Sequence, residues 1–190
     1  MRSSPRRLAA SLILGVATLG VVGATPVAAG ERSCTGNIGA RTLDDVRVPR
    51  GATCVLTGTT VKGNITVARG AVLVARGVRV VGNVQAENAA KVVVKRSSRV
   101  GGDVQADDTG RVSVVDSRVR GNIQLNDNRR LNTVRRNVVG GDVQAFQNSG
   151  GVEVYGNPID GNLQCKENRP RPVGGGNIVG GNREDQCRGF

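Results

Sequence analysis

Carboxylate side chains recur along the sequence at intervals of about twenty residues, and clustered carboxylates could supply acid–base catalysis or bind a cation. One series contains Glu87, Asp107, Asp108, Asp127 and Glu167, and a second contains Asp103 and Asp142. The chain has no His, and Asp also favours turns. We therefore expect these acids to form and solubilise corners, and we assign no catalytic residue, no metal ligand and no cofactor. A Ca²⁺ site at Asp107, Asp108 and residues 126–128 stays open.

Residues 1–29 have the organisation of a secretory signal peptide. Arg2, Arg6 and Arg7 precede an apolar run over residues 8–22, and small residues lead to a cleavage site after Ala29. We expect a secreted mature chain of residues 30–190 with no membrane span. A retained anchor is the alternative, which the short apolar run disfavours. Sec export is the default, although the Arg6–Arg7 pair leaves twin-arginine export open.

The four cysteines all lie in the mature part of the chain: Cys34, Cys54, Cys165 and Cys187. An even number of cysteines in an exported chain predicts two disulfides, with free buried thiols as the alternative. A zinc site is disfavoured because the sequence has neither His nor a Cys-x-x-Cys pair.

Seven Gly-Asn or Gly-Asp pairs form a series with spacings of 19 or 20 residues, and this spacing indicates an internal repeat. The pairs are 63–64, 82–83, 102–103, 121–122, 141–142, 161–162 and 181–182. After each of the first six glycines, apolar residues at the second and fourth positions flank a polar one. This alternation is typical of a strand with one buried face. The Gly-Asn pair tolerates positive φ, so we expect the chain to turn sharply there, where two sheets meet.

Each repeat contains three short strands, and this number predicts one coil of a parallel β-helix. A second strand lies in mid-repeat (72–74, 92–94, 112–114, 131–133 and 152–154), and a third enters the glycine corner, as at 78–80. The predicted fold is all-β and single-stranded, with about seven coils of 19–20 residues, and regular coils at about 46–182. Ile65, Val84, Val104 and Ile123 should form one interior column. Right-handedness follows the rule for parallel crossovers.

The two ends of the solenoid are predicted to be stapled by disulfides. A rod of about seven coils is about 34 Å long, so Cys34 cannot reach Cys187. The expected pairs are Cys34–Cys54 and Cys165–Cys187, each spanning about one repeat. In the last full coil, residues 169–176 (RPRPVGGG) replace the second strand, and their prolines blunt the exposed edge.

A column of glutamines occupies the polar position of successive strands: Gln85, Gln105, Gln124, Gln144 and Gln164. Stacked amides can hydrogen-bond along the rod and stabilise the stack. The alternative is a flat glycan-binding face, which the lack of neighbouring aromatic residues disfavours. Asn137, Asn157 and Asn177 indicate a second ladder at a corner.

The coil length, the Gly-Asn/Asp corners and the V-x-G-N/D-V pattern resemble the parallel β-helix superfamily over residues 46–182. In repeat style the chain is similar to bactofilins, which are polymer-forming bacterial cytoskeletal proteins, and to small exported β-solenoids of unassigned function. The bactofilin resemblance would imply filaments, but the export signal and stapled ends favour a monomer. The superfamily also includes polysaccharide lyases and glycoside hydrolases, whose large loops this chain lacks.

The formal net charge is +12, and loss of three arginines with the signal peptide leaves +9. A basic exported chain could bind an anionic cell-wall polymer or polysaccharide, although an Arg excess also arises from a GC-rich genome. Nucleic-acid binding is disfavoured because the basic residues are scattered, with local pairs at 129–130 and 135–136 and no interleaved aromatics. We expect an exported, non-enzymatic structural or interaction protein of the cell envelope or extracellular space. The alternative is a glycan-binding or glycan-cleaving β-helix.

Overall fold

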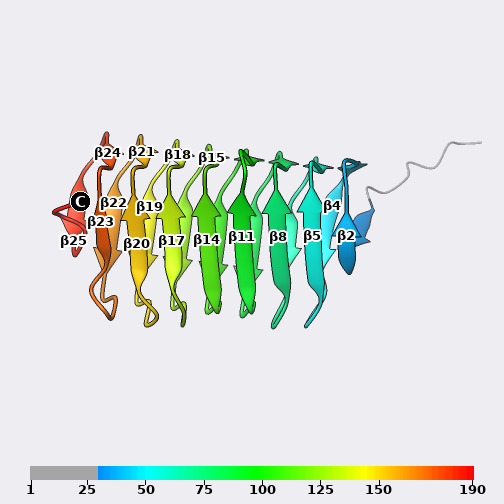
Figure 1. Ribbon diagram of the computed structural model, residues 1–190, viewed down its shortest axis with the longest axis horizontal. Helices are drawn as coiled ribbons and strands as arrows, with labels where there is room; N and C mark the ends of the chain where they lie inside the picture. Colours follow the sequence, from blue (N-terminus) through cyan, green and yellow to red (C-terminus); the bar gives the residue numbers. More distant parts are fainter. Residues whose placement is uncertain (1–29) are drawn as a thin grey trace, which may run out of the picture.

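The computed structural model describes residues 30–190, and within them every regular element is a β-strand (Figure 1). The strands form three parallel sheets. The first sheet contains β1 (Glu31–Ser33), β4 (Asp45–Val48), β7 (Ile65–Val67), β10 (Val84–Glu87), β13 (Val104–Asp107), β16 (Ile123–Asn126), β19 (Val143–Phe146), β22 (Leu163–Lys166) and β25 (Arg183–Asp185).

The second sheet, which faces the viewer in Figure 1, contains β2 (Gly36–Ile38), β5 (Thr53–Thr57), β8 (Val72–Arg76), β11 (Lys91–Lys95), β14 (Arg111–Val115), β17 (Asn132–Arg135), β20 (Val152–Tyr155) and β23 (Val173–Gly175). The third sheet contains the two-residue strands β3 (Thr42–Leu43), β6 (Thr60–Val61), β9 (Arg79–Val80), β12 (Arg99–Val100), β15 (Arg118–Val119), β18 (Val138–Val139), β21 (Pro158–Ile159) and β24 (Ile178–Val179).

Within each sheet, a strand pairs with the strand three places later in the chain, so the molecule is a parallel β-solenoid. The predicted fold class is confirmed. There are about eight turns rather than seven, because residues 31–43 supply β1, β2 and β3 and so form a further turn before the regular repeat.

The core is a stack of equivalent apolar side chains. Ile65, Val84, Val104 and Ile123 are in register on neighbouring strands and have no exposed surface. Short strands of this kind bury one face only when coils lie above and below them. The predicted interior column is therefore confirmed.

In the second sheet, the predicted mid-repeat strands are present, but β8 continues to Arg76 and β17 begins at Asn132 rather than at Leu131. Val92 pairs with Leu73, so Leu73 rather than Val72 faces the core. Asn132, not Leu131, is the buried partner of Val152. The apolar run 72–74 has no internal alternation, so its pattern alone could not fix which residues point inward. The segment at the last coil also differs, since β23 retains three paired residues after the prolines.

The glycines of the Gly-Asn/Asp pairs serve a different purpose from the one predicted. None of the seven has positive φ. Instead, in the first six pairs the Oδ1 atom of the Asn or Asp accepts a hydrogen bond from the backbone N–H of the equivalent residue one coil later. For example, Asn83 N–H donates to Asn64 Oδ1 at 2.9 Å. A Cβ on Gly82 would overlap that same oxygen. Glycine is therefore required because there is no room for a Cβ at this position. Either Asn or Asp can follow it, because only an acceptor oxygen is needed.

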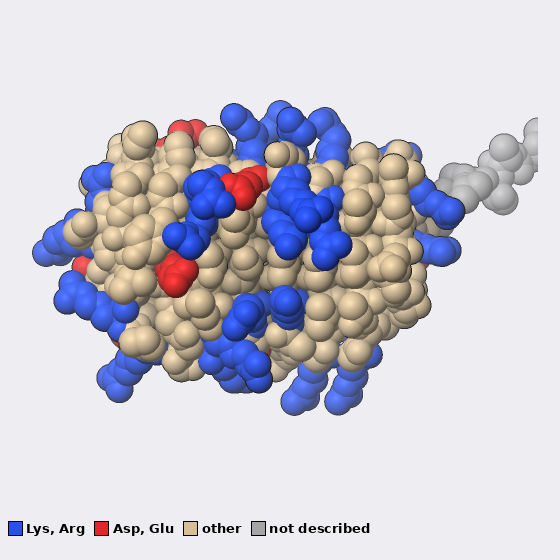
Figure 2. Space-filling view, in the orientation of Figure 1, with Lys and Arg blue, Asp and Glu red and all other residues tan. Residues whose placement is uncertain are grey.

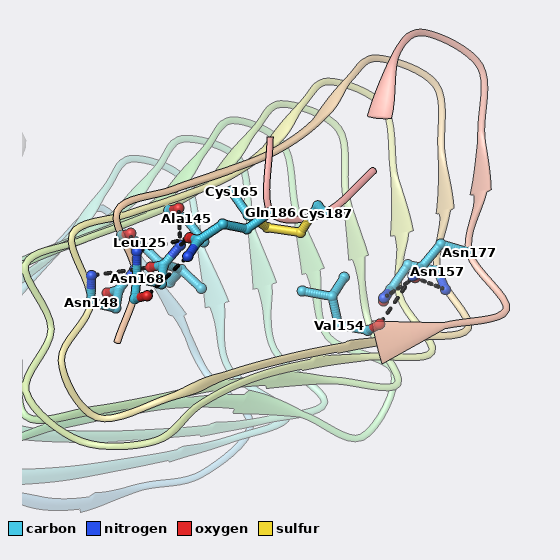
Figure 3. The surroundings of a disulfide bond; sticks show 10 residues. All are labelled: Leu125, Ala145, Asn148, Val154, Asn157, Cys165, Asn168, Asn177, Gln186 and Cys187. Atoms are coloured by element: carbon cyan, nitrogen blue, oxygen red, sulfur yellow. Dashed lines mark hydrogen bonds between the residues drawn. A yellow bond between two sulfur atoms is a disulfide. The ribbon is translucent and has the colours of Figure 1, made fainter. Parts of the chain in front are cut away.

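Both predicted disulfides are present near the ends of the solenoid. Cys34 is bonded to Cys54 with a Cα–Cα distance of 5.5 Å. Cys165 is bonded to Cys187 with a Cα–Cα distance of 5.2 Å (Figure 3). The bonds close loops with sequence separations of 20 and 22 residues. Loops of this size stabilise a fold by about 3 kcal/mol each in the chain-entropy model. The end coils, which have a neighbour on one side only, are where such cross-links contribute most.

The predicted signal peptide, with its cleavage site after Ala29, lies outside the described residues. Within residues 30–190 there is no helix of the length and apolar character needed to cross a membrane.

Candidate functional site

The glutamine column lies on the outer face of the first sheet and forms a continuous ladder. Each Nε2 atom donates to the Oε1 atom of the next glutamine, from Gln85 through Gln105, Gln124 and Gln144 to Gln164, at 2.7–3.2 Å. Gln164 Nε2 then donates to Glu184 Oε2 at 2.9 Å. Because these amides already bond to one another along the rod, fewer of their donors and acceptors are free for a glycan.

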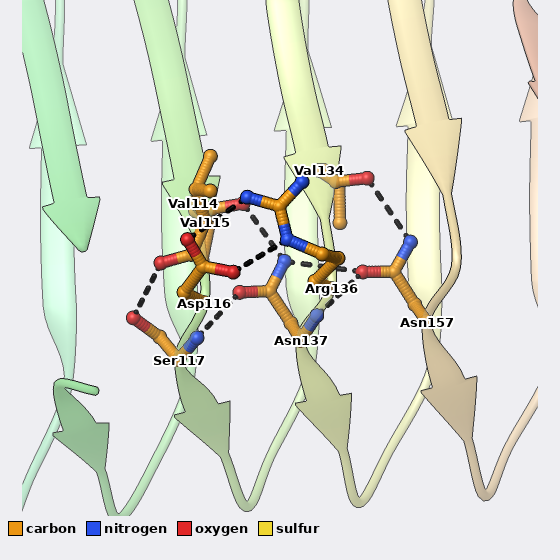
Figure 4. A network of polar contacts seen from close by, with 8 residues as sticks. All are labelled: Val114, Val115, Asp116, Ser117, Val134, Arg136, Asn137 and Asn157. Atoms are coloured by element: carbon orange, nitrogen blue, oxygen red, sulfur yellow. Dashed lines mark hydrogen bonds and ion pairs between the residues drawn. The ribbon is translucent and has the colours of Figure 1, made fainter. Parts of the chain in front are cut away.

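Two further amide columns are buried at the corners of the solenoid. The predicted column of Asn137, Asn157 and Asn177 is almost fully inaccessible to solvent. Each Nδ2 atom donates to a carbonyl oxygen of the preceding coil, as Asn157 Nδ2 does to Val134 O at 3.0 Å (Figure 4). Each Oδ1 atom accepts a hydrogen bond from a backbone N–H group of the preceding coil. These columns satisfy corner backbone groups that water cannot reach.

The second buried amide column was not predicted. It contains Asn128, Asn148 and Asn168 and ends on Gln186, next to the Cys165–Cys187 disulfide (Figure 3). Asn148 Nδ2, for example, donates to Leu125 O at 2.8 Å. The 20-residue recurrence of Asn was the signal for it. Adjacency in the sequence places Asn128 beside Asp127 in a corner acid site, whereas its side chain points inward and is buried.

The corner acids of the first series lie together at one edge. Partial burial of the carboxyl group, and then the charges of Asp127, Asp108 and Glu87, raise the pKa of Asp107 above its usual range. Within residues 30–190, however, no group of three or more His, Cys, Asp or Glu side chains is arranged to hold a metal ion. In the second series, Asp103 and Asp142 accept backbone hydrogen bonds from Asn122 and Asn162 at 2.7 Å.

Two of the turn acids form ion pairs with arginines of the next coil. Arg136 donates to both oxygens of Asp116 (Figure 4), and Arg129 pairs with Asp108. The hydrogen bond from Arg136 lowers the pKa of Asp116. The same contact raises the pKa of Arg136. These exposed pairs therefore use charges that would otherwise be available to a ligand.

The third sheet carries a row of stacked arginines that the sequence analysis did not identify. Arg79, Arg99 and Arg118 are exposed and in register on β9, β12 and β15. With Arg120, they line a hollow of about 340 Å³ whose remaining lining residues are Val80, Val81, Val100 and Gly101. Among residues 30–190, no acidic residue lines this hollow. We call it the arginine hollow.

The sequence did contain a signal for the arginine hollow. Each of its three stacked arginines directly precedes the buried valine of the third strand, at Val80, Val100 and Val119. Adjacency in the chain, as at 129–130 and 135–136, does not reveal this row, because the solenoid brings together residues that share a repeat position. Figure 2 shows basic side chains in several patches on the face it draws, with few acidic ones among them.

Comparisons of the chain with protein-family models, with curated proteins and with solved structures give no match.

Proposed function

We propose that this protein is an exported, non-enzymatic interaction protein of the cell envelope or extracellular space, and that its basic surface binds an anionic polymer there. The observation that carries the proposal is the arginine hollow. In the described part of the chain, four arginines and no acid line it, and neighbouring strands hold three of the four arginines in register. Concentrated positive charge of this kind attracts polyanions.

Export is supported by the pattern of residues 1–29 and by two disulfides, which form in oxidising compartments. A monomer is supported by the position of these bonds at the two ends of the rod. We propose that the similarity to bactofilins in repeat style extends to the architecture of the coil and not to filament formation.

A role without catalysis is supported by the contacts of the acids. Asp103 and Asp142 accept hydrogen bonds from backbone N–H groups, and Asp108 and Asp116 form ion pairs with arginines. A carboxylate pair that cleaves glycosidic bonds needs one free acid and one free base or nucleophile facing the sugar.

Sedimentation with isolated bacterial cell wall tests the proposal. The mature chain should pellet with the wall at low salt and remain in solution at high salt, because exposed charge interactions are screened within about 8 Å at physiological ionic strength. A released-sugar assay on the same samples should detect no cleavage. Release of sugars, or failure to pellet at low salt, would contradict the proposal.

A further inference from the structure

Resting on the proposed function, we propose that the arginine hollow binds a linear acidic polysaccharide, which runs along the rod axis and places one acidic sugar against each of three coils. This assigns both a site and a ligand class to the anionic polymer.

The spacing of the arginines is set by the backbone. Arg79, Arg99 and Arg118 occupy the same position of β9, β12 and β15, whose pairing fixes their register. Neighbouring strands lie about 4.8 Å apart, so the row presents a positive charge at that interval along the rod. The advance per sugar along an extended, linked chain of pyranoses is comparable to this interval. A chain of acidic sugars extended along the axis can therefore bring one carboxylate to each arginine.

The arginines of the hollow are free to bind. All four are exposed, and within residues 30–190 none of them takes part in an ion pair with an acid. A guanidinium group binds a carboxylate through two parallel hydrogen bonds, which gives orientation as well as attraction. Arg120 belongs to the corner after β15 and lines the hollow beside the row. Arg120 therefore adds a fourth positive charge near the Arg118 end of the row.

An apolar residue in the hollow favours a sugar over an inorganic polyanion. Val81 is 55 % exposed and lines the hollow beside the arginines. The C–H face of a pyranose ring can cover such a side chain and remove apolar surface from water. A polyphosphate chain has no apolar face and gains nothing from this contact. The combination of Arg and Val therefore points to an acidic glycan.

The row has defined ends, and these limit the length of the site. On one side Arg79 pairs with Thr60, and on the other Arg118 pairs with Val138. Neither neighbour is charged. The site therefore accommodates three acidic sugars, and a longer chain should gain affinity mainly by offering more overlapping registers.

The experiment titrates the mature chain with trigalacturonate and polygalacturonate, and in parallel with inorganic polyphosphate. The test variant combines Arg79→Gln, Arg99→Gln and Arg118→Gln. The control variant combines Lys91→Gln, Arg111→Gln and Arg130→Gln, which removes the same charge from the side of the second sheet. Val81→Ser probes the apolar contact, and the single variant Arg99→Gln repeats the test with the least change to the surface.

The test variant should bind polygalacturonate about tenfold more weakly, because three exposed ion pairs are lost. The control variant should change affinity less than about twofold, since distant charges are screened. Val81→Ser should weaken trigalacturonate binding by about twofold and leave polyphosphate binding unchanged. Arg99→Gln should give a smaller loss than the test variant.

Two outcomes would overturn the inference. If the test and control variants lose affinity equally, the hollow is not the site. The ligand class is wrong if polyphosphate binds as tightly as polygalacturonate and Val81→Ser changes neither the affinity for polyphosphate nor the affinity for the glycan. The proposed function fails separately. A native chain that does not pellet with cell wall contradicts that function, whereas pelleting that survives in the test variant contradicts only the assignment of the hollow.

Discussion

Replacement of Asn157 by Leu is expected to lower the free energy of unfolding by about 3–5 kcal/mol. The effect is large because several buried polar groups lose their hydrogen-bond partners at once. Asn157 Oδ1 accepts from the backbone and side-chain nitrogens of Asn137 at 2.9 and 3.1 Å. Its Nδ2 atom donates to Val134 O and to Asn177 Oδ1 at 3.0 and 2.9 Å. Leu has a similar volume but can replace none of these bonds.

The matched control is Gln144→Leu. Gln144 also bonds to amides of the coils before and after it, at 3.0 and 2.8 Å. It lies on the outer face, where water can take over its partners, so the expected loss is below about 1 kcal/mol. Urea unfolding followed by circular dichroism measures both variants. Equal losses for Asn157→Leu and Gln144→Leu would mean that the corner column is not a buried network.

Replacement of Gly102 by Ala is expected to lower the free energy of unfolding by about 2–4 kcal/mol, because it combines an overlap between coils with a lost hydrogen bond. An added Cβ would overlap Asn83 Oδ1 and lie 3.2 Å from the carbonyl carbon of Gly82. Asn83 Oδ1 accepts the Asp103 N–H at 2.8 Å, so moving that oxygen breaks this contact between coils.

Gly39→Ala is the corresponding control, since a Cβ at Gly39 would meet nothing within 4 Å. We expect its stability to stay within about 0.5 kcal/mol of the native chain. Thermal and urea unfolding should rank the two variants in this order. A Gly102→Ala chain as stable as the Gly39→Ala chain would show that the glycine is retained for a reason other than space.

The apolar pattern was sufficient to predict the architecture because its period reports burial directly. Ile65, Val84, Val104 and Ile123 alternate with polar residues, and each has the same place in a repeat of fixed length. A shift of one residue would expose the whole column, so register follows from the sequence. The disulfide pairing followed in the same way, from the length of the predicted rod.

The polar positions could not be predicted as well, because residue type alone does not tell an inward amide from a solvated one. Asn128 and Asn148 resemble ordinary turn residues, yet both are fully buried. Gly102 resembles a residue that permits an unusual φ, yet its role depends on an oxygen of the preceding coil. The arginine hollow required the register of the third sheet, whose two-residue strands carry little pattern of their own.

The glutamine ladder, the buried asparagine columns and the arginine hollow all require that each repeat of 19 or 20 residues advances the chain by one strand spacing along the rod. Distances between pairs of spin labels on the outer column of the first sheet test it directly. The label pairs Thr66–Gln144, Thr66–Gln164 and Arg47–Gln164 are four, five and six strands apart in the register. The solenoid predicts backbone separations of about 19, 24 and 29 Å, rising by one strand spacing at each step. Distances that do not rise in this order, or that change by much more than one strand spacing per repeat, would contradict the account.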